Sequence, residues 1–236
     1  MRTKLLVFIL VLMLGGVLSA CGPTTIYTQP EPPARTITVS GTGMVTLTPD
    51  VAYVYIGVQT QDASATKAMD DNNARAQAVI EAIKSFGVKN EDIKTTNFSI
   101  YPQPVYDENY NQVGVTYVVN NTVYVTVRDL DKLGALLDAS FRAGANTIHS
   151  ISFDVADKTN AISQARLAAV ENARRQAEEL AKATGVEIGK VQTITYYDST
   201  PSPVYYARMD AKAEGVPIEV GSMQIVTTVT IVYEIK

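Results

Sequence analysis

Alternation of apolar and polar residues marks most of the chain beyond its N-terminal part as β-strand. In 36–45, apolar residues or glycines recur at every second position, which is the period of a half-buried strand. In 51–61, apolar residues lie on both faces, which predicts a well-covered strand. The same alternation predicts a long hairpin, with strands at 93–105 and 113–127 joined by a polar connection. Three further strands are predicted over 147–155, 191–197 and 218–235.

Three segments, 63–86, 129–143 and 158–184, carry apolar residues at helical spacing instead. In the first of them, Asn72 and Asn73 lie near the apolar stripe, either as boundary residues or with one of them bonded to a neighbouring backbone group. The last helix has small residues at every fourth position, which allow close packing: Ala165, Ala169, Ala173 and Ala177. Strand pairs separated by single helices predict an α+β fold in two layers, with mainly antiparallel sheets packed by helices.

The N-terminus has the pattern of a signal peptide. Arg2 and Lys4 precede an apolar run, 5–18, which is too short to span a bilayer comfortably and has the length of a signal-peptide core. The run ends in Leu-Ser-Ala-Cys at 18–21, which resembles the bacterial lipobox. In a lipobox the cysteine is acylated and the signal is cut just before it.

Two alternatives to a lipobox are an ordinary signal peptide with an incidental cysteine and a short membrane anchor. The lipobox is favoured because Cys21 is the one cysteine of the chain. We therefore predict a lipoprotein signal peptide over 1–20, a proline-rich tether over 21–34 and a folded domain over 35–236. Acylated Cys21 would hold the domain at a membrane on the extracytoplasmic side of a bacterial cell envelope.

Composition narrows the classes of function. Hydrophobic residues make up 46% of the 236 and charged residues 19%, which is typical of globular proteins and excludes a disordered or collagen-like chain. The 20 basic and 24 acidic residues give a net charge of -4, and no basic cluster is present, which argues against nucleic-acid binding. One cysteine and one histidine exclude an internal disulfide and a zinc site built from His and Cys.

Candidate chemical motifs are weak throughout. His149 is predicted to be structural or exposed, because no free cysteine or second histidine can act with it. Gly41-Thr42-Gly43 is half of a phosphate-binding loop without the helix that should follow, so a structural glycine pair is favoured. The acidic pairs at 70–71 and 107–108 do not have the spacing of a calcium loop. We predict no catalytic residue, no metal and no cofactor.

Tyrosines are distributed unevenly along the chain. They gather at the hairpin tip and around 198–217, a long connection without a clear pattern. Tyrosine on exposed loops favours protein contacts, because the ring offers area and the hydroxyl tolerates water. Ordinary strand and edge packing is the alternative. The candidate interface residues are Tyr106, Tyr110, Tyr205 and Tyr206.

Several short motifs, in their order and spacing, resemble the SIMPL-domain family of bacterial YggE-like envelope proteins. They are VSGTG at 39–43, TPD at 48–50, GVKNEDIKT at 87–95, VRDL at 127–130, GAN at 144–146 and the alanine-rich helix that ends at Gly185. The resemblance covers nearly all of 35–236. It implies an α+β fold of two interleaved subdomains in the bacterial envelope, a suggested role in oxidative or envelope stress tolerance, and no established catalytic residues. At least one family member forms a large ring-like oligomer.

Three functional hypotheses remain. The first is a non-enzymatic, lipid-anchored envelope protein that assembles into a homo-oligomer. The second is a binding module that recruits a protein partner of unknown identity through its Tyr-rich hairpin and the long connection. The third is an enzyme that uses carboxylates and tyrosines, which is the least favoured because no suitable acidic pair stands out.

Overall fold

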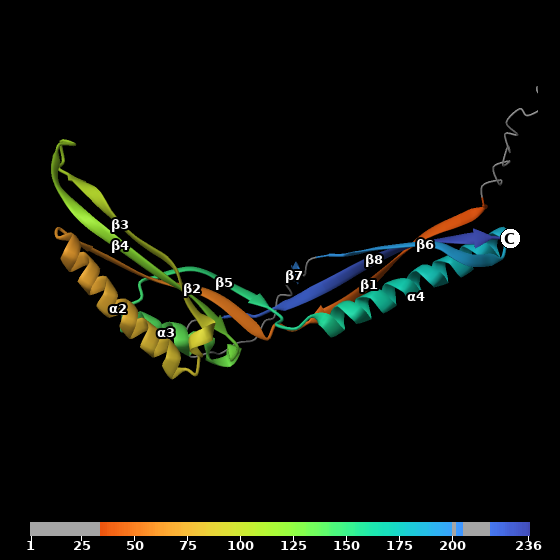
Figure 1. Ribbon diagram of the computed structural model, residues 1–236, viewed down its shortest axis with the longest axis horizontal. Helices are drawn as coiled ribbons and strands as arrows, with labels where there is room; N and C mark the ends of the chain where they lie inside the picture. The colour runs from red at the N-terminus through yellow and green to blue at the C-terminus, as the bar shows by residue number, and fades with distance from the viewer. Residues whose placement is uncertain (1–33, 200–201, 205–217) are drawn as a thin grey trace, which may run out of the picture. The chain divides into compact units, whose positions relative to one another are not determined.

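The computed structural model describes residues 34–199, 202–204 and 218–236. All of its described helices and strands lie in one compact unit, Thr36–Lys236, which is distinct from Met1–Arg35. Two β-sheets organise this unit, and helices pack on one face of each (Figure 1). Within Thr36–Lys236, three hydrophobic core clusters lie between the sheets and the helices that pack on them.

The terminal layer is built from both ends of this unit, with β8 (Ser222–Ile235) as its central strand. β1 (Thr36–Leu47) pairs antiparallel with one edge of β8. β6 (Ile188–Asp198) and the short β7 (Ser202–Val204) pair antiparallel with the other edge. The long helix α4 (Thr159–Thr184) runs along β1 and β8 on one face of this sheet (Figure 1).

Helix α4 approaches β1 backbone to backbone. Its inward stripe consists of buried alanines at every fourth position: Ala161, Ala165, Ala169, Ala173, Ala177 and Ala181. Gly41 and Gly43 of β1 lie opposite this stripe. A Cβ at Gly43 would overlap the carbonyl oxygen of Ala165, and one at Gly41 would overlap that of Ala169. The glycine pair is therefore structural, as the sequence predicted.

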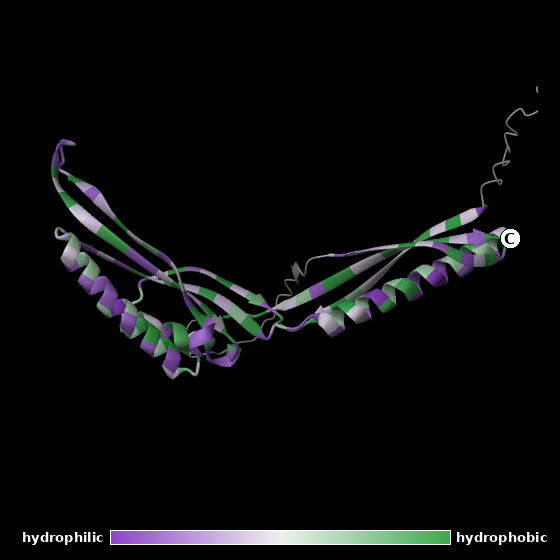
Figure 2. Ribbon diagram, in the orientation of Figure 1, coloured by the Kyte–Doolittle hydropathy of each residue, from purple (hydrophilic) through white to green (hydrophobic). Residues whose placement is uncertain are grey.

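The central layer is an antiparallel sheet in the order β3–β4–β2–β5, with helices α2 and α3 on one face. Its elements are β2 (Val51–Asp62), α2 (Ala65–Ser85), β3 (Ile93–Tyr106), β4 (Gln112–Val127), α3 (Leu133–Ala143) and β5 (Thr147–Asp154). Hydrophobic positions recur along these strands, and the outer side of α2 is hydrophilic (Figure 2). This pattern is typical of a sheet that buries one face against helices.

Strand β2 shows how the two faces of the central sheet differ. Alternate residues from Ala52 to Val58 are buried against α2 and α3. Tyr53 and Tyr55 lie on the opposite face, where their rings pack with Tyr124 at centroid distances of 5.7 and 5.0 Å. Period-two alternation therefore separates a helix-covered face from an open, tyrosine-bearing face.

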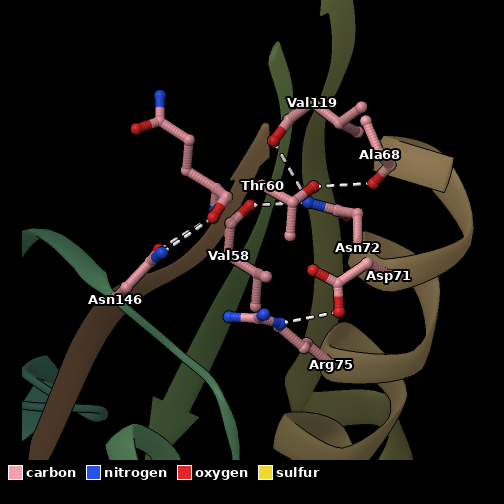
Figure 3. A network of polar contacts seen from close by, with 9 residues as sticks. Val58, Thr60, Ala68, Asp71, Asn72, Arg75, Val119 and Asn146 are labelled. Atoms are coloured by element: carbon pink, nitrogen blue, oxygen red, sulfur yellow. Dashed lines mark hydrogen bonds and ion pairs between the residues drawn. The ribbon is translucent and has the colours of Figure 1, made fainter. Parts of the chain in front are cut away.

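A buried polar contact ties α2 to two strands. Asn72 is fully buried, and its Nδ2 donates to the carbonyl oxygens of Val58 at 3.0 Å and Val119 at 3.1 Å (Figure 3). One side chain thus bridges β2 and β4. Near the start of the helix, Thr60 Oγ1 donates to the carbonyl oxygen of Ala68 at 2.7 Å. Of the two interpretations of this asparagine, the backbone-bonded one is correct.

The predicted α+β fold is confirmed, with three local differences. The helix predicted over 129–143 begins with a 3₁₀ turn, Leu130–Lys132, in which the Lys132 N–H bonds to the Asp129 carbonyl oxygen. The final strand begins at Ser222, because Gly221 has a φ of 68° and cannot continue an extended chain towards residue 218. The short strand β7, within the long connection, was not predicted.

Candidate interaction surface

The far end of the β3–β4 hairpin extends beyond the rest of its sheet. β2 pairs with β4 only as far as Tyr117, which lies opposite Asp62, whereas the β3–β4 ladder continues to Tyr106 opposite Gln112. Residues 102–116 therefore form a two-stranded ribbon, and we call this ribbon, together with the β3 residues 98–101 that lead into it, the arm. Every residue from Tyr101 to Val115 is exposed. A two-stranded ribbon is at best marginally stable alone, so an exposed arm gains from contact with another surface.

Apolar side chains lie on the arm without cover. Ile100 lies opposite Val119, which is fully buried on the helix-packed face, yet Ile100 itself is 43% exposed. Phe98, two residues earlier on the same face, is 50% exposed. Side chains of this face form what we call the arm strip, which comprises Phe98, Ile100, Pro102, Pro104 and Val115. Contiguous apolar side chains left in solvent are typical of interaction sites.

Two prolines determine how a partner can meet the arm. Pro102 and Pro104 lie in β3, which among the described strands pairs only with β4 and is therefore an edge strand. The ladder with β4 continues past both of them, so their missing N–H donors belong on the outer edge. That edge lacks two successive donors for adding another strand. A partner is therefore expected to contact the faces of the arm rather than to extend its sheet.

The tip of the arm is a hydrophilic turn (Figure 2). Asp107 Oδ1 accepts the backbone N–H groups of Asn109 at 2.8 Å and Asn111 at 2.9 Å. The bond from the Asn111 N–H is the main cause that lowers the pKa of Asp107. These bonds hold Tyr110 at a φ of 60°, with 88% of its surface exposed. The tip therefore presents a fixed turn with a tyrosine ring in solvent.

The structure places two of the four tyrosines that the sequence selected. Tyr106 is 58% exposed at the end of β3, and Tyr110 lies at the tip. Tyr205, Tyr206 and Cys21 lie outside the described residues. The arm strip was not identified from sequence, because Phe98 and Ile100 alternate as any half-buried strand does. The edge position of β3 was the signal available, through its prolines.

Other candidate groups of the sequence occupy separate places. His149 lies exposed on β5. In the terminal layer, Arg166 of α4 bonds to Asp198 and also lies 4.9 Å from the ring centroid of Tyr196. The hydrogen bond from Arg166 is the main cause that lowers the pKa of Asp198, and Thr227 adds a bond of 2.8 Å. This network fixes α4 to the β6 edge.

The described part of the chain gives two negative findings. Within 34–199, 202–204 and 218–236, no three His, Cys, Asp or Glu side chains are grouped so that they could hold a metal ion. No helix in these same ranges combines the length and the apolar character that crossing a membrane requires.

Comparison with known proteins identifies relatives that match nearly all of the folded unit. The profile of the SIMPL family, described as a protein of unknown function (DUF541), matches residues 37–233. The 26 kDa periplasmic immunogenic protein of Brucella melitensis is 34% identical over 215 residues, which cover 86% of each chain.

Two enterobacterial relatives match to a similar extent. The uncharacterised protein YggE of Escherichia coli K12 is 32% identical over 207 residues, which cover 85% of this chain and 83% of that protein. The uncharacterised protein YggE of Edwardsiella ictaluri is 32% identical over 211 residues, which cover 89% of this chain and 87% of that protein. The matches therefore span both sheets and include the arm.

Proposed function

The chain belongs to the SIMPL family, and from this premise we propose that it is a non-enzymatic, lipid-anchored protein of the bacterial envelope that assembles with copies of itself through the arm. Its surface rather than a catalytic centre would carry the function. The stress tolerance suggested for the family would then depend on the assembled form.

The observation that carries this proposal is the exposed apolar arm. Phe98, Ile100 and Tyr106 are between 43% and 58% exposed, although each belongs to a regular strand. Burying such side chains stabilises an association by about 25 cal/mol for each Å² of apolar surface removed from water. The absent donors at Pro102 and Pro104 favour a face-to-face contact, which can be specific without extending a sheet indefinitely.

The location outside the cytoplasm is supported by two independent observations. The Brucella relative is named a periplasmic protein. This chain also carries a signal-like run followed by Cys21 in a lipobox-like motif. We propose that acylation of Cys21 distinguishes it from a freely diffusing periplasmic protein, and that 21–34 is the tether between membrane and folded unit.

The test of assembly is the solution mass of residues 35–236, measured by light scattering coupled to size exclusion over a range of concentrations. We expect a discrete oligomer. The double substitution Tyr106→Ser with Tyr110→Ser should lower its mass at a given concentration, because it removes two exposed rings from the arm. Tyr197→Ser, which removes a ring that is 73% exposed on β6, is the matched control and should leave the mass unchanged.

A monomer at all concentrations would contradict self-assembly. The same arm would then favour the second hypothesis, a binding module that recruits a protein partner. In that case the Tyr106→Ser and Tyr110→Ser substitutions should abolish capture of the partner while the melting temperature stays the same. Equal effects of the arm and Tyr197 substitutions would show that the arm has no special role.

A further inference from the structure

A pocket of about 250 Å³ opens at one end of the central layer, away from the arm. It lies where the chain leaves α2 and where β4 leads towards α3. Its apolar lining includes Val127 and Leu136, which are buried, and Phe86 and Val88, which pack against the central core. An apolar lining of this kind can accept a short hydrocarbon group.

Five charged side chains line the same pocket, and three of them are basic: Lys89, Arg128, Lys132, Asp92 and Asp129. The Asp92 side chain is 9% exposed, and it accepts bonds from Arg128 Nε at 3.4 Å and Nη2 at 2.9 Å. Asp129 Oδ2 lies 2.6 Å from Lys132 Nζ. Each carboxylate of the lining therefore already has a cation, and Lys89 is the basic side chain whose carboxylate partner, Glu91, does not line the pocket.

The basic groups keep unused hydrogen-bond donors. A guanidinium has five N–H groups and an ammonium has three. Arg128 and Lys132 each bond to one carboxylate, so each keeps N–H groups that can donate to a ligand. Lys89 contacts Glu91 at 3.5 Å, and both side chains are more than 70% exposed, so this pair is weak. The hydrogen bond to Asp129 raises the pKa of Lys132, which therefore stays charged at neutral pH.

We propose that this pocket binds a small carboxylate, with its charge at Lys89, Arg128 and Lys132 and its short apolar tail against Val127 and Leu136. The unused N–H donors of the three basic groups favour an anion, and the apolar lining selects one with a hydrocarbon group. A free short-chain acid and the C-terminal carboxylate of a peptide share this chemistry. The proposal does not depend on self-assembly, because the pocket lies within a single chain.

Binding is tested with hexanoate as the probe on residues 35–236, by saturation-transfer NMR titration. We expect saturable binding with a Kd of about 1 mM, as is ordinary for so small a ligand. Lys89→Gln with Lys132→Gln should raise that Kd about fivefold, since each exposed ion pair contributes little. Lys182→Gln with Lys190→Gln makes the same change of charge in the terminal layer and should leave the Kd unchanged.

Several outcomes would overturn the proposal. The first is the absence of saturation in the parent protein, and the second is binding of hexan-1-ol with the same Kd as hexanoate. The third is an equal rise in Kd from the two double lysine substitutions. The fourth is an unchanged Kd in the Lys89 and Lys132 variant when its melting temperature shows that it is folded. N-acetyl-L-leucine distinguishes the two sources of the carboxylate. Tighter binding than hexanoate supports a peptide C-terminus, and weaker binding supports a free acid.

Discussion

The surroundings of Asn72 strictly limit which side chain can replace it. Its Nδ2 serves two carbonyl oxygens from different strands, and its Oδ1 is buried without a hydrogen-bond partner among the described residues. The site thus needs a donor and offers nothing to an acceptor. An acceptor in place of the amide nitrogen would face the oxygens of Val58 and Val119, which repel it.

We predict that Asn72→Asp lowers the free energy of unfolding by about 3 kcal/mol at pH 7. Burial and the two facing carbonyl oxygens raise the pKa of the introduced carboxyl in the folded state. The loss should therefore be smallest below the unfolded pKa of about 3.9, and it should grow as the pH rises through the raised folded value. Urea denaturation between pH 3 and pH 8 measures this dependence.

Asn73→Asp is the matched control for this substitution. Asn73 is the next residue of α2 and is exposed, so the same change of charge there should alter the free energy of unfolding by less than about 0.5 kcal/mol at any of these pH values. Similar pH profiles for the two variants would mean that Asn72 does not hold its strands through the amide.

Hydrogen bonds from a side chain to backbone groups also explain the Gly-Ala-Asn motif at 144–146. Gly144 has a φ of 122°, which an L side chain rarely adopts, and it ends α3. Asn146 then pairs with the backbone of Gln59: its Oδ1 accepts the N–H at 2.8 Å, and its Nδ2 donates to the carbonyl oxygen at 2.7 Å. The side chain thereby bonds to β2 two residues beyond Gly57, where the β2–β5 pairing ends, so these contacts give the motif a structural role.

At the scale of elements, the contact between α4 and β1 is close enough to bring helix backbone against strand backbone. The alanine stripe lets the helix backbone approach the sheet, and Gly41 and Gly43 leave room for its carbonyl oxygens. This contact leaves no room for a larger side chain on β1, because a Cβ at either glycine would already overlap the helix backbone. Added volume must therefore push the helix away.

We predict that Gly43→Val lowers the free energy of unfolding by about 3 kcal/mol, because its Cβ would overlap the carbonyl oxygen of Ala165. Thr42→Val is the control, since Thr42 lies on the exposed face and its backbone N–H keeps its bond to Asn172 Oδ1 at 3.1 Å. It should change stability by less than about 0.5 kcal/mol. Urea denaturation compares them, and equal stability would contradict the close approach of α4.

Periodicity in the sequence predicted the elements because each sheet buries one face and each helix one stripe. It could not predict that β1 and β8, from opposite ends of the unit, pair along their length, because register is a long-range property. The glycine pair and the alanine stripe were both identified, but their contact was not. The arm strip was missed for a related reason: alternation at Phe98 and Ile100 looks the same whether or not a helix covers them.

At the scale of the whole molecule, the proposed anchor and the proposed assembly surface belong to different units of the chain. Cys21 precedes the folded unit, whereas the arm is part of it. The described core clusters belong to the folded unit, which begins after the proposed tether. Membrane attachment and self-assembly should therefore be separable by substitution.

We predict that Cys21→Ser moves the protein from the membrane fraction to the soluble extracytoplasmic fraction of cells while its melting temperature and solution mass remain unchanged. The reason is that each buried methylene of an acyl chain contributes about 0.8 kcal/mol to membrane binding, and serine cannot form the thioether that carries the acyl groups. Thr24→Ser, three residues further on, keeps Cys21 and should remain in the membrane fraction.

Retention of the Cys21→Ser protein at the membrane, with mass spectrometry showing an uncut N-terminus, would instead make the apolar run 5–18 the anchor. A soluble Cys21→Ser protein that is monomeric, where the parent is oligomeric, would show that assembly needs the membrane surface as well as the arm.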